Sequence, residues 1–433
     1  MKVKMGLVIL LVVILLSTCG CSTNNNGQGK QPEVKPNNDE NEKNELIMAT
    51  IGSSRSELIA DRRVIDMVNE FNASQDLYHI TIVNFNTGET GNTAVGEEQG
   101  MTRLFTELAA GQYPDLICFD NISPYPFIAN GMLLDMKSYM SNDADIHIED
   151  IVAYKALRAW GGVYLMSNHL SPYGLSALRS RFGDRIGWTI QEYLEIEDSL
   201  PDGSFMLYNT TREMFLETMV MNYLGTAIDW EKGTCDFNNP DFTAILEASR
   251  RIHEDNSGEV EFGIGGLQSL EAGQYIAMFY GPAFPHELAK MEPSLTPIGW
   301  PTVDGRCGTM VYYQNPIGIM KKSSHLDGAW AFIKYMLMTP DGSNMRLPTW
   351  RPLLEDALLR AQHSETFPSI NEEQASAFLD LMDHVEIFYQ HDPVVLRIIM
   401  DECSTFLAGE RSAEDTAALI QSKMQIYVGE RWK

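Results

Sequence analysis

The feature that most constrains the fold is an alternation of strand-like and helix-like segments between residues 46 and 119. Three segments are short apolar runs or alternate apolar and polar residues, which is typical of strands: 46–52, 78–85 and 115–119. Two segments between them carry apolar residues near helical spacing: 56–71 and 100–110. Strand, helix, strand, helix, strand at this pitch predicts an α/β fold, with a mainly parallel sheet and crossover helices.

Longer helical patterns dominate after Trp188. The sequence predicts helices at 189–200, 211–224, 240–255 and 326–337, and a nearly continuous helical pattern from about residue 371. Two strand-like stretches interrupt them, 275–280 and 318–320. A chain of 433 residues is too long for one compact core, so this change of character indicates two or three domains.

The charge balance is strongly acidic. The chain has 59 acidic and 32 basic residues, a formal net charge of -27. This field repels phosphate backbones, so we expect no nucleic-acid partner. The ligand is expected to be neutral or cationic, or to be held by local contacts that ignore the global field.

The N-terminus is typical of an export signal. Lys2 and Lys4 precede an unbroken apolar run, 6–16, which is short for a bilayer-spanning helix. The following LSTCGCS resembles the lipobox of bacterial lipoproteins, which implies a diacylglycerol anchor (with palmitate) on Cys21. Cys19 is the alternative lipid site, and an ordinary cleaved signal is the other interpretation.

This interpretation divides the first 45 residues in two. Residues 1–20 are the signal peptide, and residues 21–45, polar and almost free of apolar side chains, are predicted to be a disordered tether. The folded body would then sit on the outer face of the cytoplasmic membrane.

The four remaining cysteines are Cys118, Cys235, Cys307 and Cys403. They form no CxxC pair and no zinc-type spacing with histidine. We expect buried thiols, with a Cys235–Cys307 disulfide as the alternative.

Six segments in register resemble the extracellular solute-binding proteins of family 1, the sugar-type, maltose-binding-like proteins of ABC importers. They are 104–116 (LFTELAAGQYPDL), 131–136 (GMLLDM), 187–193 (GWTIQEY), 236–242 (DFNNPDF), 272–278 (AGQYIAM), and 318–319 (GI) with 329–335 (AWAFIKY). The sequence departs from the family pattern at 165–175 (LMSNHLSPYGL).

The resemblance implies two α/β lobes that close on a ligand held between them. Lobe 1 would comprise residues 46–160 and 311–365, and lobe 2 residues 161–310 and 366–433. It also implies a monomer that needs no cofactor, binds a carbohydrate, in particular an oligosaccharide, and delivers it to the permease subunits of an ABC importer.

Candidate ligand-binding residues follow from the chemistry of sugars, which present C–H faces to aromatic rings and hydroxyls to planar polar groups. Aromatic and arginine side chains near strand ends, glycines or prolines are the first group: Trp160, Tyr280, Trp300, Tyr312, Trp350 and Arg351. Trp350 and Arg351 lie between Pro348 and Pro352, where we expect irregular backbone. Asp120 and Ser53 follow predicted strands, where ligands of open α/β sheets bind. Trp188 and Trp330 lie in scaffold motifs and are predicted to be core residues.

Catalytic and metal-binding motifs are weak in this sequence. It contains no GxSxG, HExxH, P-loop or GxGxxG, and 142–145 (NDAD) lacks the remaining ligands of a calcium loop, so a capped turn is expected there. We therefore expect a binding protein without catalysis and without a metal. Two alternatives stay open, a surface glycoside hydrolase or lyase and a binding protein for a cation such as a polyamine or peptide.

We expect replacement of Cys21 by alanine to release the protein into the medium. A diacyl anchor holds a protein firmly on a membrane, whereas a body this acidic has no other attraction to an anionic surface. Cell fractionation under conditions that strip peripheral proteins measures the effect. A variant that stays bound would point to Cys19 or to an uncleaved signal helix.

Overall fold

The computed structural model describes residues 43–51, 59–86, 93–119, 122–158, 160–255, 264–340, 346–389 and 392–431. All of these residues belong to one compact unit, Lys43–Lys433. The predicted signal peptide, Cys21 and residues 21–42 of the predicted tether lie outside the described residues.

The first sheet confirms the predicted parallel arrangement near the start of the body. Its strand order is β10-β3-β1-β2. Its strands are β1 (Asn44–Thr50), β2 (Tyr78–Asn84), β3 (Leu116–Cys118) and β10 (Ile317–Ile319). β1 is parallel to both β2 and β3, and β10 is antiparallel to β3. β1 begins at Asn44, two residues before the predicted start of folded sequence at Leu46.

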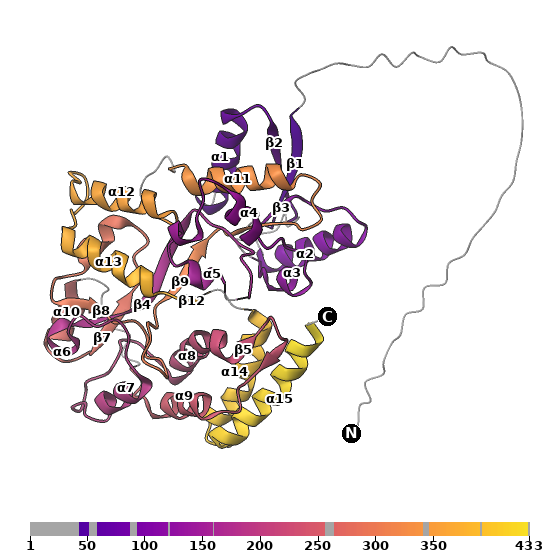
Figure 1. Cartoon of the computed structure of the whole chain (residues 1–433). Helices are drawn as coiled ribbons and strands as arrows, with labels where there is room; N and C mark the ends of the chain where they lie inside the picture. The colour runs from indigo at the N-terminus through magenta and orange to yellow at the C-terminus, as the bar shows by residue number, and fades with distance from the viewer. Residues whose placement is uncertain are drawn as a thin grey trace, which may run out of the picture. The chain divides into compact units, whose positions relative to one another are not determined.

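Four helices of the N-terminal part and one later helix, α11, accompany this sheet (Figure 1). They are α1 (Ile59–Ser74), α2 (Thr93–Ala109), α3 (Tyr125–Ala129), α4 (Lys137–Asn142) and α11 (Leu326–Met338). α11 packs on β1, β10 and α1. Gly328 permits this approach, because a Cβ at that position would lie 2.7 Å from the ring of Tyr78. α2 begins at Thr93, seven residues before the predicted start.

The second sheet is built around β4 (His169–Leu178), a strand that the sequence analysis did not predict. The other strands are β7 (Ala277–Tyr280), β8 (Leu295–Pro297), β9 (Met310–Gln314), β11 (Leu347–Pro348) and β12 (Ile387–Phe388). β4 is antiparallel to β7, β8, β9 and β11, and β12 is parallel to β9. Much of the segment that departs from the family pattern is therefore the central strand of this sheet.

Helices surround the second sheet and complete the chain. The helices between Ile148 and Lys290 are η1 (Ile148–Asp150), α5 (Tyr154–Leu157), α6 (Arg179–Phe182), α7 (Ile190–Glu197), α8 (Arg212–Ala227), α9 (Pro240–Arg251), α10 (Ile264–Glu271) and η2 (Pro285–Lys290). The later helices are α12 (Arg351–Gln362), α13 (Glu372–His384), α14 (Pro393–Leu407) and α15 (Ala413–Arg431). A short hairpin, β5 (Ile228–Asp229) with β6 (Thr234–Cys235), follows α8.

Local sequence signals explain where several of these helices start. Thr189 and Glu192 form a capping box at α7, and the side chains of Thr211 and Asn239 cap α8 and α9. The predicted helices at 189–200, 211–224 and 240–255 are thus confirmed. α14 and α15 pack on α8 and α9 as one helical layer (Figure 1).

None of the four cysteines Cys118, Cys235, Cys307 and Cys403 forms a disulfide, so the alternative Cys235–Cys307 pairing is wrong. The prediction of buried thiols is confirmed for Cys118, Cys307 and Cys403, whereas Cys235 is only partly buried. Trp188 and Trp330 are buried, as predicted. Within the described part of the chain, none of the helices combines the length and apolar character needed to cross a bilayer.

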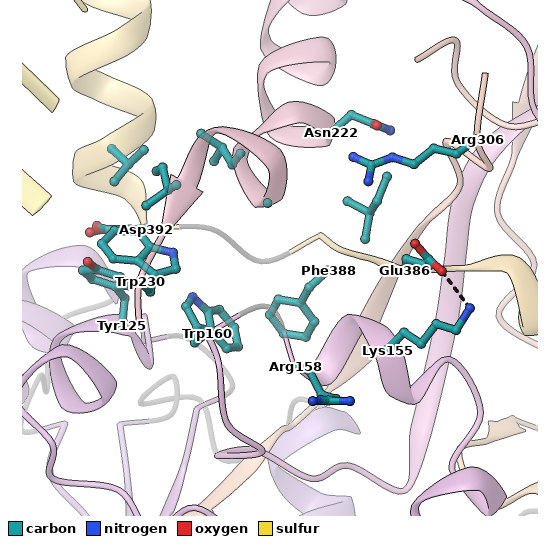
Figure 2. A pocket seen from close by; sticks show the side chains of 15 residues that line it. Tyr125, Lys155, Arg158, Trp160, Asn222, Trp230, Arg306, Glu386, Phe388 and Asp392 are labelled. Atoms are coloured by element: carbon teal, nitrogen blue, oxygen red, sulfur yellow. Dashed lines mark hydrogen bonds and ion pairs between the residues drawn. The ribbon is translucent and has the colours of Figure 1, made fainter. Parts of the chain in front are cut away.

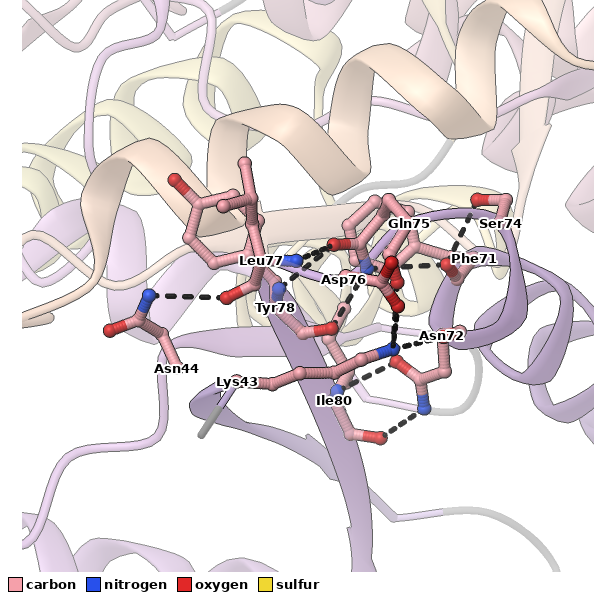
Figure 3. Close-up of polar contacts among 10 residues, drawn as sticks. All are labelled: Lys43, Asn44, Phe71, Asn72, Ser74, Gln75, Asp76, Leu77, Tyr78 and Ile80. Carbon is pink, nitrogen blue, oxygen red and sulfur yellow. Dashed lines mark hydrogen bonds and ion pairs between the residues drawn. The ribbon is translucent and has the colours of Figure 1, made fainter. Parts of the chain in front are cut away.

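Lys43 fastens the first residues of the described body to the end of α1 (Figure 3). Its Nζ donates hydrogen bonds to the carbonyl oxygens of Asn72 (2.8 Å) and Gln75 (2.7 Å), and lies 3.8 Å from the carboxylate of Asp76. Helix C-termini leave carbonyl groups without intrahelical partners, and a cation is favoured there. The contact ties the start of β1 to the α1–β2 turn.

We expect replacement of Lys43 by methionine to lower the free energy of unfolding by about 1 kcal/mol. Methionine keeps the length of the side chain but removes the two charge-assisted hydrogen bonds. Urea unfolding measures the change.

Lys321→Met is a matched control, because Lys321 is an exposed lysine that loses the same charge. Equal losses in the two variants would show that the α1 contact does not stabilise the fold.

Candidate functional site

The main cavity of the described residues has a volume of about 260 Å³ (Figure 2). Its walls come from α3, from α5 and the turn after it, from the C-terminal half of α8 with β5, and from the segment around β12. The lining residues are Tyr125, Lys155, Arg158, Trp160, Asn222, Leu224, Gly225, Ile228, Trp230, Arg306, Glu386, Ile387, Phe388, Asp392 and Val395. Segments far apart in sequence thus meet at one hollow.

Aromatic rings form two pairs on the cavity wall. The ring centroids of Tyr125 and Trp230 are 4.5 Å apart with an interplanar angle of 57°. Those of Trp160 and Phe388 are 4.9 Å apart, edge to face at 74°. Such geometry is favourable between aromatic rings, so each pair fixes the orientation of its members. Phe388 is also stacked on Tyr313 of β9 at 5.6 Å.

A smaller cavity of about 60 Å³ lies beside the aromatic residues of the main cavity. It shares Tyr125, Trp160 and Trp230 with the main cavity. Its other lining residues are Ile128, Ala129, Tyr164 and Val428, so this compartment is largely apolar. The two cavities thus have three aromatic side chains in common.

Three polar groups of the main cavity are held by neighbours. Lys155 Nζ lies 2.7 Å from Glu386 Oε1, and this hydrogen bond raises the pKa of the lysine. Asn222 donates from Nδ2 to the carbonyl oxygen of Gly308 at 2.7 Å. Asp392 is the N-cap of α14 and accepts from the Val394 amide at 2.9 Å. These contacts make the polar groups of the wall rigid.

Two arginines also line the main cavity. Arg306 donates from Nη2 to Thr226 Oγ1 at 2.7 Å. Arg158 is exposed, and the described part of the chain offers its guanidinium neither a hydrogen bond nor an ion pair. Guanidinium groups supply several donors in a fixed plane, a geometry that matches pairs of oxygen atoms.

The cavity can therefore bind a molecule that has both apolar faces and many oxygen atoms. Flat rings accept the C–H faces of a ligand, and rigid donors and acceptors fix its orientation. Among the described residues, no group of three or more histidine, cysteine, aspartate or glutamate side chains is placed to hold a metal ion.

Of the eight residues proposed for ligand contact from sequence, Trp160 lines the main cavity. Trp300 is 2% exposed and packs against Tyr173 and Phe279, with ring centroids 5.7 Å apart in each case. Tyr312 lies on β9 with its ring 6.2 Å from that of Tyr389.

The remaining candidates lie elsewhere. Tyr280 ends β7, as predicted, and is buried, which raises the pKa of its hydroxyl. Trp350 is buried at the N-cap of α12, and Arg351 is the first helical residue, in an ion pair with Asp383. The expectation of irregular backbone is therefore wrong for Arg351, because Pro352 occupies an early helical position that proline tolerates. Asp120 and Ser53 lie outside the described residues.

Most of the cavity wall could not be predicted from the sequence. Trp230 stands in the turn of the β5–β6 hairpin, where a large aromatic side chain in a polar turn was the available signal. Tyr125 begins a helix of five residues, and Phe388 belongs to a strand of two. Elements this short carry no periodic pattern from which their inward side could be predicted.

The chain belongs to the family of bacterial extracellular solute-binding proteins, whose family model matches residues 83–340. This is a family of binding proteins that act outside the cytoplasm. No curated protein sequence matches the chain significantly.

Solved structures of low sequence identity share the fold. The cyclic α-maltosyl-1,6-maltose binding protein of Arthrobacter globiformis is 16% identical over 90% of this chain and 100% of that protein, with a TM-score of 0.55. The sugar-binding protein MalE of Xanthomonas citri is 14% identical over 89% and 98%, with a TM-score of 0.58. A periplasmic oligogalacturonide binding protein of Yersinia enterocolitica is 14% identical over 90% and 100%, with a TM-score of 0.57. The predicted two-lobe α/β fold is confirmed.

The acidic turn at 142–145 belongs to the scaffold. Asp143 accepts hydrogen bonds from Lys334 Nζ (2.8 Å) and Trp330 Nε1 (2.9 Å), and Lys334 also reaches Asp145 at 2.5 Å. Burial raises the pKa of Asp143, but these hydrogen bonds and the amide of Asp145 outweigh it and lower the pKa to about 2. The turn fastens α4 to α11.

We expect Asp143→Asn to lower the free energy of unfolding by about 1–2 kcal/mol at pH 7. The pKa of Asp143 in the folded state lies below the ordinary aspartate value of 3.8, so the ionised carboxylate stabilises the fold above that pH. The stabilisation disappears as the pH falls through about 2, and the two proteins should converge there. Chemical unfolding between pH 7 and pH 2 measures this.

The matched control is Asp145→Asn, which removes the same charge beside the same lysine from a side chain that is 60% exposed. A constant difference between wild type and Asp143→Asn at every pH would contradict the assignment to this carboxylate.

Proposed function

We propose that this chain is a membrane-tethered extracytoplasmic protein that binds an oligosaccharide and delivers it to an ABC importer. The observation that carries the proposal is the cavity in which Trp160, Trp230, Tyr125 and Phe388 face rigid polar groups. The family membership supports the transport role, because its members bind solutes outside the cytoplasm.

The chemistry of the cavity favours a sugar over a purely apolar or purely ionic ligand. Sugars combine C–H faces, which pack on aromatic rings, with hydroxyl pairs that planar polar groups recognise. Proteins that share this fold are named for cyclic maltosyl-maltose, sugar and oligogalacturonide ligands. Two cavities of about 260 and 60 Å³ that share three lining residues suit a ligand of more than one ring.

The proposed lobes divide the cavity wall between them. With lobe 1 at 46–160 and 311–365, the residues Tyr125, Lys155, Arg158 and Trp160 belong to lobe 1. With lobe 2 at 161–310 and 366–433, the other lining residues belong to lobe 2. A ligand that touches both lobes binds the closed arrangement better than the open one, so it favours closure.

The proposed location at the outer face of the cytoplasmic membrane is based on the signal-like N-terminal sequence. We propose that Cys21 carries the lipid, that residues 21–45 are the tether, and that the body works as a monomer beside its permease subunits. Trp160 is the leading candidate for ligand contact. Ligand contact by the other candidates, Ser53, Asp120, Tyr280, Trp300, Tyr312, Trp350 and Arg351, stays a prediction.

A thermal-shift screen of the purified body against neutral and acidic oligosaccharides tests this function. A ligand at 100 times its Kd should stabilise the protein by about 2.7 kcal/mol. For a sugar found in this way, we expect Trp160→Ala to weaken binding by about 30-fold, because a stacked aromatic anchor is often worth about 2 kcal/mol. Calorimetry measures the affinity.

Phe367→Ala is a suitable control, since Phe367 is an exposed aromatic residue that does not line the cavity. Stabilisation by polyamines or peptides with no response to any sugar would contradict the proposal. Release of reducing ends from the bound sugar would show an enzyme instead.

A further inference from the structure

The charge of the main cavity is opposite to that of the chain. The chain carries 59 acidic and 32 basic residues. The cavity, however, is lined by three cations (Lys155, Arg158 and Arg306) and by two carboxylates (Glu386 and Asp392). If the cavity lining had the average composition of the chain, it would contain more acidic than basic residues.

Both cavity carboxylates already have partners. Glu386 is neutralised by Lys155 at 2.7 Å. Asp392 accepts from the Val394 amide and from the hydroxyl of Tyr427, and it lies at the N-terminus of α14, where a negative charge is favoured. Neither carboxylate therefore requires a cationic ligand to balance its charge.

The two arginines, in contrast, retain donors for a ligand. The Nε atom of Arg306 is buried and has no hydrogen-bond partner among the described residues. This atom lies 3.7 Å from the carboxylate of Asp304, which is an ion pair too long for a hydrogen bond, so Asp304 offsets part of the charge of Arg306. Arg158 lines the cavity with no side-chain partner in the described ranges. A guanidinium that lines a cavity can form charge-assisted hydrogen bonds with the oxygen atoms of a ligand.

We infer that the cavity takes a carbohydrate that bears carboxylate groups, such as a uronic-acid oligosaccharide. This inference rests on the proposed function and specifies its ligand. A guanidinium pairs with a carboxylate through two parallel hydrogen bonds, and in Figure 2 Arg306 and Arg158 lie to either side of Phe388. The aromatic pairs hold the sugar rings while each arginine takes a carboxylate.

The acidic surface does not prevent such a ligand from binding. At physiological ionic strength, charges more than about 8 Å apart at the surface are largely screened. Inside the cavity the arginines act at contact distance and in a lower dielectric, so their effect outweighs the distant carboxylates. From the sequence we expected either a neutral or cationic ligand, or a ligand held by local contacts regardless of the net charge. An acidic sugar corresponds to the second expectation.

The test uses uronic-acid oligosaccharides, each paired with its carboxyl-reduced counterpart, which has the same rings and linkages but no charge. Calorimetry with the whole body gives both affinities at low and at physiological salt. We expect at least one acidic sugar to bind ten times more tightly than its reduced partner, with a preference that shrinks as salt is added.

Variants of the two arginines test whether the preference for acidic sugars arises in the cavity. Arg306→Gln and Arg158→Gln should each reduce the preference, which is the ratio of the two affinities, at least threefold, whatever their effect on the affinity for the reduced sugar. Arg251→Gln is the control, since Arg251 loses the same charge in α9, away from the cavity lining. Melting temperatures without ligand confirm that each variant is folded.

The outcomes separate the two proposals. Equal or weaker binding of the acidic sugars, with clear binding of reduced ones, overturns the inference and leaves the carbohydrate function standing. The inference is also overturned if both arginine variants still prefer the acidic sugar over its reduced partner as strongly as the wild type does. No binding of any acidic or neutral sugar overturns the proposed function, and the inference with it.

Discussion

The second half of the structure depends on one strand, β4. It hydrogen-bonds to β7, β8, β9 and β11, so it joins segments that are up to 180 residues apart in sequence. Side chains alternate across a sheet, and a slip of one residue in β4 would exchange its two faces. Gly174 secures the register, because a Cβ there would lie 2.7 Å from Thr309 Oγ1.

This register places the elements that build the cavity. Consecutive residues of β9 face opposite ways, so Tyr312 contacts Tyr389 while Tyr313 stacks on Phe388. The hydroxyl of Tyr313 donates to the carbonyl oxygens of Val152 and Ala153 at 3.0 and 2.9 Å. These bonds hold the segment that continues into Lys155, Arg158 and Trp160. The cavity wall is thus fixed by the sheet beneath it.

Electrostatics work at two scales in this molecule. The net charge of -27 describes the surface as a whole and makes nucleic-acid binding unfavourable. In the cavity the nearby groups decide: Lys155 and Glu386 cancel each other, Arg306 lies 3.7 Å from the carboxylate of Asp304, and Arg158 has no ion pair among the described residues. The ligand chemistry therefore follows from which charges are paired, a property that composition does not contain.

The sequence by itself determined the elements with strong local patterns. The parallel strands at 46–52, 78–85 and 115–119 and the capped helices α7, α8 and α9 follow from periodicity and from capping residues, which act within a few positions. Tertiary structure alone decided β4, whose Pro172 and Gly174 hide its strand pattern and whose stability comes from four partners. It also decided the cavity: Trp160 was predicted, but Trp230, Tyr125 and Phe388 lie on short elements that only long-range packing brings together. The physical reason is the same in both cases, because pairing partners and cavity walls come from residues that are distant in sequence.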